Sequence, residues 1–182
     1  RAREKGLEIC VTVGAGTPAR LMGDAGRLRQ ILFNLAGNAV KFTQEGGVVI
    51  EIGPVEGRIR FTVRDTGPGI PADKQAEIFE AFGQADASHT RLYGGAGLGL
   101  AIVRKLAGAM GGAAAVRSRP GAGSAFWVDL PFAKAAPPSS GAPPLQGLTA
   151  VVLTANPVLG DAIVQNIQTL GGRASRAENV SA

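Results

Sequence analysis

The segment Gly94-Gly95-Ala96-Gly97-Leu98-Gly99-Leu100-Ala101-Ile102-Val103 decides the fold of this chain. Its glycines alternate with small or apolar residues, and a run of helix-forming residues follows them. Glycine tolerates positive φ and lets the backbone approach a ligand closely. A glycine loop that opens a helix directs unpaired N–H groups and the positive end of the helix dipole outward, which favours phosphate binding. Because such loops are common, the meaning of this one depends on the motifs around it.

Composition narrows the class of protein. The 182 residues suffice for one domain and part of another, and with 45% hydrophobic and 18% charged residues we expect a folded core. The net charge is +5, but the basic residues are scattered, which favours a small anionic ligand over nucleic acid. The single Cys10 cannot form an internal disulfide, and no long apolar run or signal peptide is visible. We expect a cytoplasmic fragment of a longer protein.

Hydrophobic patterning predicts an α+β sandwich over residues 1–132. Asp24 is a suitable N-cap for a helix over residues 25–42. The predicted strands are residues 7–13, 48–52, 58–64, 113–118 and 124–130, and the other predicted helices are residues 73–80 and 98–110. We expect residues 48–52 and 58–64 to form a hairpin joined through Gly53-Pro54 and Gly57.

Asn34, Asn38 and Lys41 form a polar stripe on the first predicted helix, at positions i, i+4 and i+7. Two asparagines are unfavourable in a helix interior. The amide oxygens and the ammonium group suit a hydrated Mg²⁺ and a phosphate. A merely solvated stripe is the alternative, and the helix alone leaves both interpretations open.

Two segments separate this helix from the glycine loop. Asp65-Thr66-Gly67-Pro68-Gly69 ends a strand and can place a carboxylate beside a flat ligand, although a simple turn aspartate is the commoner case. Residues 83–93 are polar and unpatterned, and are predicted to be a lid. His89 lies there without a neighbouring carboxylate, so we do not expect it to accept phosphate.

A change of composition marks the end of this unit. Residues 133–147 are rich in proline and alanine and are predicted to be a semi-rigid linker. An apolar strand over residues 148–153, a helix over 157–170 and a second strand follow. Over residues 148–182 this is the start of an incomplete doubly wound α/β domain.

The motifs together resemble the catalytic ATP-binding domain of bacterial sensor histidine kinases, in the family that includes DNA gyrase and heat-shock chaperone ATPases. The resemblance covers residues 1–132 and implies the Bergerat fold, a two-layer α/β sandwich with a mixed sheet. Four motifs in the family's order and spacing carry it: Asn34-Leu-Ala-Gly-Asn38-Ala-Val-Lys41, Asp65-Thr-Gly-Pro-Gly69-Ile70, Ile78-Phe79-Glu-Ala-Phe82 and Gly95-Ala-Gly97-Leu-Gly99-Leu-Ala-Ile.

The resemblance implies ATP and Mg²⁺ as ligands. Asp65 would accept the adenine amino group, Asn38 would hold Mg²⁺ beside Asn34, and Lys41 would meet phosphate. The implied nucleotide-binding set also contains Gly67, Gly69, Ile70, Phe79, Arg91, Tyr93, Gly95, Gly97, Leu98, Gly99, Leu100 and Ser124.

The resemblance also indicates phosphoryl transfer over hydrolysis. In the hydrolysing members the position of Asn34 is a glutamate that activates water, and an asparagine cannot take that proton. The acceptor histidine is expected on a dimerisation domain outside this chain, in a full-length homodimer that passes phosphate to a response regulator or receiver domain.

The C-terminal segment resembles the start of a receiver domain, as in hybrid histidine kinases. Thr154-Ala155 stand where a receiver carries two acidic residues, so we expect a degenerate receiver with a regulatory role. Arg173 and Arg176 make an anionic effector a candidate partner, although two solvated arginines are the commoner case.

Other functional classes fit less well. A non-catalytic module that binds ATP to gate a partner is the main alternative. A dinucleotide-binding oxidoreductase would need a strand before the glycines and an acidic residue about 20 positions later, and neither is present. A P-loop ATPase would need a Gly-Lys-Ser/Thr ending.

Overall fold

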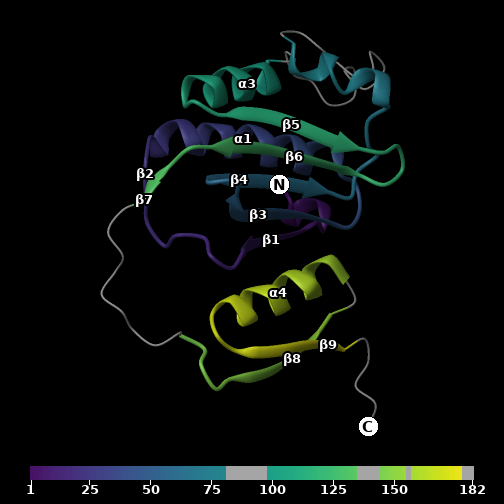
Figure 1. Ribbon diagram of the computed structural model, residues 1–182. Helices are drawn as coiled ribbons and strands as arrows, with labels where there is room; N and C mark the ends of the chain where they lie inside the picture. The colour runs from purple at the N-terminus through teal and green to yellow at the C-terminus, as the bar shows by residue number, and fades with distance from the viewer. Residues whose placement is uncertain (81–97, 135–143, 155–156, 178–182) are drawn as a thin grey trace.

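The computed structural model describes residues 1–80, 98–134, 144–154 and 157–177 (Figure 1). The N-terminal part contains η1 (Arg3–Lys5), β1 (Glu8–Val13), β2 (Leu21–Met22), α1 (Ala25–Phe42), β3 (Gly47–Val55), β4 (Arg58–Asp65), η2 (Ala72–Lys74) and η3 (Glu77–Phe79). After the gap follow α3 (Gly99–Ala109), β5 (Ala113–Ser118), β6 (Ser124–Leu130), β7 (Ala133–Lys134), β8 (Thr149–Leu153), α4 (Pro157–Thr169) and β9 (Arg173–Ala177).

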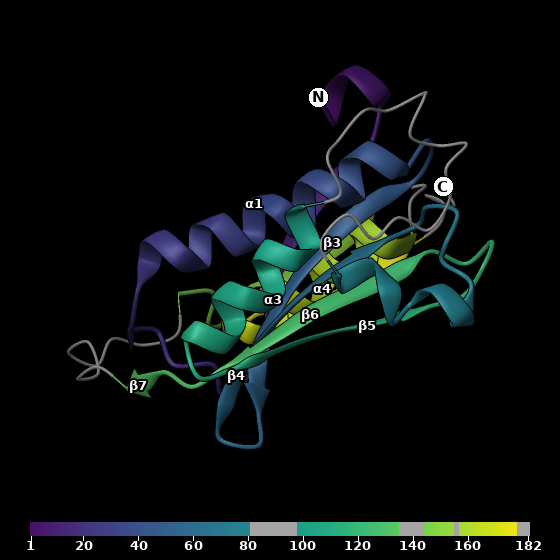
Figure 2. The same cartoon turned by 90° about the horizontal axis from the view of Figure 1, so that it is seen from above.

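A five-stranded mixed sheet of order β1-β3-β4-β6-β5 is the centre of the fold. β1 runs parallel to β3, and the other neighbours are antiparallel. Helices α1 and α3 pack against each other and cover one face of the sheet (Figure 2). The predicted α+β sandwich with a mixed sheet is therefore confirmed.

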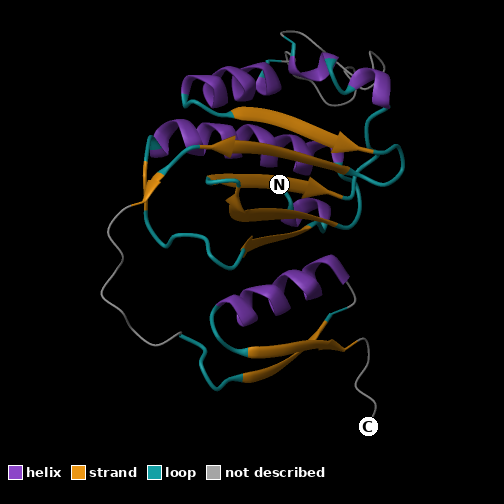
Figure 3. Cartoon of the chain, in the orientation of Figure 1, coloured by secondary structure: helices purple, strands orange, loops and turns teal. Residues whose placement is uncertain are grey.

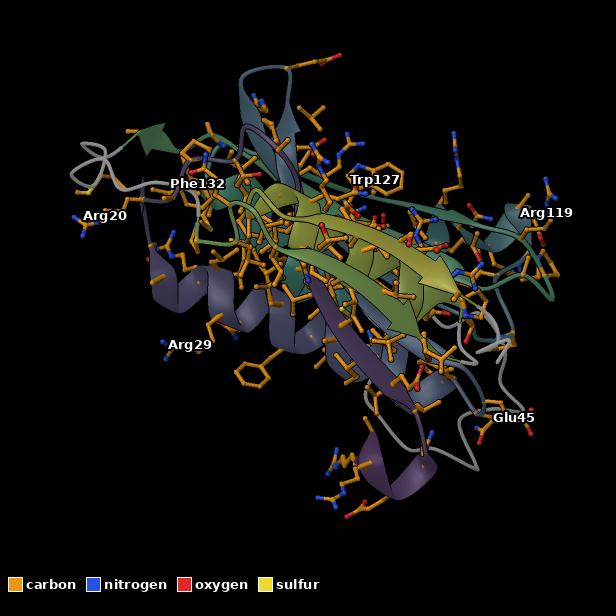
Figure 4. All side chains as sticks on the ribbon, turned by 90° about the horizontal axis from the view of Figure 1, so that it is seen from below. Arg20, Arg29, Glu45, Arg119, Trp127 and Phe132 are labelled. Carbon is orange, nitrogen blue, oxygen red and sulfur yellow. The ribbon has the colours of Figure 1, made fainter. Side chains whose placement is uncertain are left out.

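The core lies between this sheet and the two helices. Its buried side chains alternate along the strands and recur every three or four residues along the helices, as amphipathic elements require. They include Ile31 and Leu35 of α1, Val63 of β4, Val103 of α3 and Val128 of β6, all 0–1% exposed. Trp127 has the opposite orientation to Val128 and lies on the side of the sheet away from α1 (Figure 4).

The predicted cap of α1 is present. The Asp24 side chain accepts a hydrogen bond from the Arg27 N–H at 2.9 Å, which satisfies one of the unpaired donors at the start of the helix. Arg29 of the same helix points away from the body of the protein (Figure 4). The bounds of α1, β5 and β6 coincide with the predicted ranges.

The hairpin between β3 and β4 differs from the prediction. Pro54 lies inside β3 and pairs with Ile59, and the turn is made by Glu56 and Gly57 alone. Both turn residues have positive φ, 49° and 77°, as a two-residue turn matched to strand twist requires. Pro54 is tolerated because β1 pairs with β3 only as far as Ile52, so no neighbour on that side needs its N–H.

The predicted helix over residues 73–80 was wrong. The segment forms two separate 3₁₀ turns, η2 and η3, and the second buries Ile78 and Phe79 in the core.

Cys10 is only partly buried, because β1 is an edge strand.

The C-terminal unit consists of β8, α4 and β9. The two strands are parallel and α4 connects them, as the predicted β-α-β order requires (Figure 3). Val152 of β8 and Ala162 of α4 are buried. Strand β7, which precedes the C-terminal unit in the chain, pairs with β2. None of the helices in the described ranges has the length and apolar character needed to cross a membrane.

Candidate functional site

Asp65 occupies the last position of the central strand β4 and is only 7% exposed. Its Oδ1 accepts two backbone hydrogen bonds, from Gly67 N at 2.9 Å and from Ser124 N at 3.2 Å. Neither bond uses Oδ2, which leaves that oxygen available to a ligand donor. Burial raises the pKa of the carboxyl group, and the two N–H donors partly oppose this shift.

Glycines let the backbone close around this carboxylate. Gly69 has a φ of +73°, and a β-carbon there would overlap the Arg119 carbonyl. Gly123 has a φ of +81°, and its β-carbon would overlap the carbonyl of Asp65. At Gly67 a β-carbon would lie 2.9 Å from Asp65 Oδ1. Side chains at Gly69 and Gly123 would force the turn and the β5–β6 hairpin apart, and a side chain at Gly67 would press on the carboxylate itself.

Hydrogen bonds fasten the turn after Asp65 to the β5–β6 hairpin. The Ile70 N–H donates to Ser118 Oγ at 2.8 Å. Ser118 Oγ lies 2.9 Å from the Gly123 carbonyl oxygen and 3.0 Å from Ser124 Oγ. Gln75 Nε2 donates to the carbonyls of both Ile70 and Ser118, at 3.0 and 2.9 Å. Gln75 was not predicted, and no sequence pattern singles it out.

The asparagines of the polar stripe face the first turn of α3. A β-carbon on Gly99 would lie 3.6 Å from Asn34 Oδ1 and 3.9 Å from Asn38 Nδ2. Both asparagines are partly buried, so the stripe lies in an interhelical contact. Lys41 Nζ lies 4.7 Å from the centroid of the Phe42 ring, one turn beyond Asn38.

The remaining predicted residues have different environments. Phe79 is buried in the core, where its ring packs edge-on against Phe126 at a centroid distance of 6.4 Å. Leu98 is 38% exposed at the start of α3, and Leu100 is partly buried. Four predicted residues lie outside the described residues: Arg91, Tyr93, Gly95 and Gly97.

Two clusters of predicted residues therefore border the site. Asp65, Gly67, Gly69 and Ser124 surround a buried carboxylate, and Asn34, Asn38 and Gly99 meet at the start of α3. The first cluster suits a flat group that donates a hydrogen bond. The second places amide groups beside a helix N-terminus, where negative charge is stabilised.

Comparison with known proteins agrees with this geometry. The model of the family described as "Histidine kinase-, DNA gyrase B-, and HSP90-like ATPase" matches residues 23–134. This range contains both clusters and more than half of the chain. The chain belongs to this family.

Its relatives include sensor proteins and a histidine-protein kinase. The sensory/regulatory protein RpfC of Xanthomonas campestris pv. campestris is 45% identical over 139 residues, which cover 73% of this chain and 19% of RpfC. The histidine-protein kinase BarA of Escherichia coli K12 is 44% identical, with 71% and 15% covered. The sensor protein GacS of Pseudomonas syringae pv. syringae is 41% identical, with 93% and 20% covered. The chain thus spans a fifth or less of these curated relatives' length.

Solved structures share the fold. Full-length ShkA in complex with AMPPNP has a TM-score of 0.87 and 47% identity, over 98% of this chain and 37% of ShkA. The mycobacterial sensor histidine kinase MprB has a TM-score of 0.61 and 30% identity, over 74% of this chain and 88% of the MprB chain. The match to ShkA includes the C-terminal unit, and the match to MprB covers less of this chain.

Proposed function

We propose that this chain is the ATP-binding part of a hybrid histidine kinase, which presents Mg²⁺-ATP for phosphoryl transfer to a histidine on a dimerisation domain. The arrangement of Asp65 carries the proposal. A buried carboxylate with one oxygen fixed by two N–H groups, and the other uncommitted, suits a ligand that donates a single hydrogen bond from a flat ring.

The proposed adenine end is preorganised. Because Gly67, Gly69 and Gly123 lack side chains, the backbone can close tightly around Asp65 and hold its carboxylate in place. The Gln75 and Ser118 hydrogen bonds hold that backbone before any ligand arrives, so less ordering accompanies binding. Ile70 would supply apolar contact beside the ring.

The proposed phosphate end is the contact between α1 and α3. Asn38 would contribute an amide oxygen to Mg²⁺, which takes few protein ligands when phosphates and water supply the rest. Asn34 would lie beside it, and Lys41 would neutralise phosphate charge. Phosphoryl transfer requires positioning and charge neutralisation, which these groups supply without covalent chemistry. The AMPPNP in the ShkA structure supports nucleotide binding in this fold.

Asn34 favours transfer over hydrolysis. A carboxamide cannot accept a proton at neutral pH, so the position cannot activate water as a general base. We therefore propose that bound ATP is retained until the acceptor histidine arrives. A response regulator or a receiver domain would then receive the phosphate, which the similarity to the signalling proteins RpfC, BarA and GacS supports.

We propose a regulatory role for the C-terminal unit. Thr154 stands where a receiver would carry an acidic Mg²⁺ ligand, and it cannot supply that charge. The two arginines proposed for an anionic effector have different surroundings. Arg176 Nε forms an ion pair with Asp161 at 3.1 Å. Arg173, three residues earlier on β9, is exposed. An effector that used both would have to replace the Asp161 ion pair.

Calorimetric titration of the chain with Mg²⁺-ATP tests the proposal, with Asp65→Asn as the variant. Asparagine retains an oxygen for the Gly67 and Ser124 N–H groups but turns the free oxygen into a donor. We expect the fold to persist and the affinity to fall by about 10- to 100-fold, as for one charge-assisted hydrogen bond. Equal affinities would contradict the adenine assignment. If the chain bound ATP but transferred no phosphate to an added histidine-bearing dimerisation domain, a nucleotide-sensing module would be the better interpretation.

A further inference from the structure

Strand β1 forms an edge of the five-stranded sheet and has one row of backbone groups that β3 does not use. The N–H groups of Glu8 and Gly14 donate toward β3, to Gly46 O and Ile52 O. Backbone groups alternate in direction along a strand, so those of Val11 and Val13 point to the free edge. An edge of this kind accepts a further strand unless another element covers it.

The side chain of Asn166 on α4 occupies this edge. Its Nδ2 donates to the Val11 carbonyl at 2.6 Å, and its Oδ1 accepts the Val13 N–H at 3.3 Å. In a parallel ladder, one residue bonds in the same way to the two residues that flank its partner. The carboxamide therefore imitates a parallel strand residue opposite Thr12.

Packing extends the contact beyond the two hydrogen bonds. α4 packs against both β1 and β3. Thr12 lies on the edge strand but is only 2% exposed. Leu159 and Ile163 precede Asn166 on the same side of α4 by helical periodicity, and both are partly buried. The two hydrogen bonds lie at the solvent-exposed margin of this packed contact, so they fix the position of the helix more than they stabilise it.

We infer that helix α4 of the C-terminal unit is an intramolecular docking partner for the free edge of the ATPase-family sheet, and that Asn166 sets its position along that edge. A carboxamide has one donor side and one acceptor side, so it fits only between a free carbonyl and a free N–H two residues later. On β1 the pairs Ile9–Val11 and Val11–Val13 meet this condition, and the structure uses the second.

The tether favours docking. Residues 135–144 connect β7, which pairs with β2, to Leu145, whose N–H donates to the Leu170 carbonyl. A short linker gives an effective concentration in the millimolar range. A modest contact therefore suffices to keep α4 on β1. The docking surface lies at the β1 edge, whereas the proposed nucleotide site involves β4 and β6. The inference thus goes beyond nucleotide binding and does not depend on it.

Amide hydrogen exchange in the whole chain, without nucleotide, tests the inference with Asn166→Asp. The new carboxylate oxygen would face the Val11 carbonyl, and like partial charges would repel. We expect the Val13 amide to exchange about tenfold faster or more than in the unaltered chain. The Gly14 amide, bonded to Ile52 within the sheet, serves as an internal reference and should not change.

Gln165→Glu is the matched control, because it makes the same amide-to-acid change at the adjacent, exposed position of α4. It should leave Val13 exchange unaltered. Equal Val13 exchange in the unaltered chain and Asn166→Asp would overturn the inference. Protection of Val13 that rises with protein concentration would also overturn it, since the edge would then be covered by a second copy.

Val13→Pro provides a second route if Asn166→Asp disturbs the C-terminal unit itself. Proline at position 13 removes the N–H that donates a hydrogen bond to Asn166 Oδ1. An edge strand tolerates proline at a position whose N–H faces away from the sheet. We expect small-angle scattering to show a larger radius of gyration for Val13→Pro than for the unaltered chain. An unchanged radius in a folded variant would contradict docking through Asn166.

Discussion

The side-chain oxygen of Asn34 on α1 lies 3.6 Å from the point that a β-carbon would occupy on Gly99, at the first residue of α3. This distance is ordinary van der Waals contact. A methyl group at Gly99 would therefore fit without moving the helices, but it would occupy space between the asparagines and the helix N-terminus.

Gly99→Ala should separate folding from ligand binding. We expect no loss of stability, because alanine fits the space and favours a helix over glycine. We expect the affinity for Mg²⁺-ATP to fall severalfold, because the methyl group would crowd the proposed phosphate end. Thermal unfolding and calorimetric titration measure the two effects.

Gly108→Ala is the control for this prediction. A β-carbon on Gly108 of the same helix meets nothing within 4 Å. The substitution should stabilise the chain by up to about 1 kcal/mol and leave the affinity unchanged. If both variants bound nucleotide equally well, the start of α3 would not border the phosphates.

The raised pKa of Asp65 predicts opposite pH effects on folding and binding. Between the ordinary pKa of an aspartate and the higher value in the fold, the native state binds more protons than the unfolded state. The free energy of unfolding should therefore rise as the pH falls into this window, since protonation removes a buried charge.

Nucleotide affinity should fall over the same window, because a protonated carboxyl group is a weaker acceptor for an amino group. Urea unfolding and nucleotide titration at several pH values measure the two slopes. In Asp65→Asn the contribution of this group to the stability slope should vanish. An unchanged slope would mean that Asp65 does not titrate in this window.

The sequence predicted elements whose period is clear. Helix α1 has a cap at Asp24 and a regular apolar face, so both ends were predicted correctly. The segment after Ile70 is short, and its conformation depends on distant partners. Gln75 donates hydrogen bonds to the Ile70 and Ser118 carbonyls, and Phe79 is buried in the core. Two 3₁₀ turns allow both contacts, whereas the sequence pattern predicted one helix.

The candidate site shows the same division. The Asp65 motif can be recognised in the sequence from the spacing of its glycines. The hydrogen bond from the Ser124 N–H to Asp65 Oδ1, however, depends on the register between β4 and β6. The contact of Asn166 with β1 joins residues about 155 positions apart. No local pattern encodes such a pair, because both residues look ordinary in their own segments.

The ion pair of Arg60 and Asp129 should stabilise the sheet measurably. The guanidinium makes two bonds across β4 and β6, at 2.6 and 2.7 Å, and lies 5.0 Å from the centroid of the Trp127 ring. Lysine cannot reproduce the paired bonds. We expect Arg60→Lys to lower the free energy of unfolding by about 1 kcal/mol in urea denaturation.

Arg64→Lys provides the comparison. Arg64 meets Glu51 through one bond of 3.3 Å, and both side chains are more exposed than the Arg60 pair. We expect Arg64→Lys to lower the free energy of unfolding by less than about 0.5 kcal/mol. Equal effects of the two substitutions would mean that the paired geometry adds nothing to the stability of the sheet.

Asn34→Glu should introduce ATP hydrolysis. A carboxylate at this position can accept a proton from water, which the amide cannot do, and general-base assistance contributes roughly 100-fold or more when the geometry is good. Asn34→Gln adds the same length without a base, so it controls for crowding against Gly99. We expect phosphate release by the glutamate variant at least about tenfold faster than by the glutamine variant. Equal rates in two variants that still bind ATP would show that the amide at position 34 is not what prevents hydrolysis.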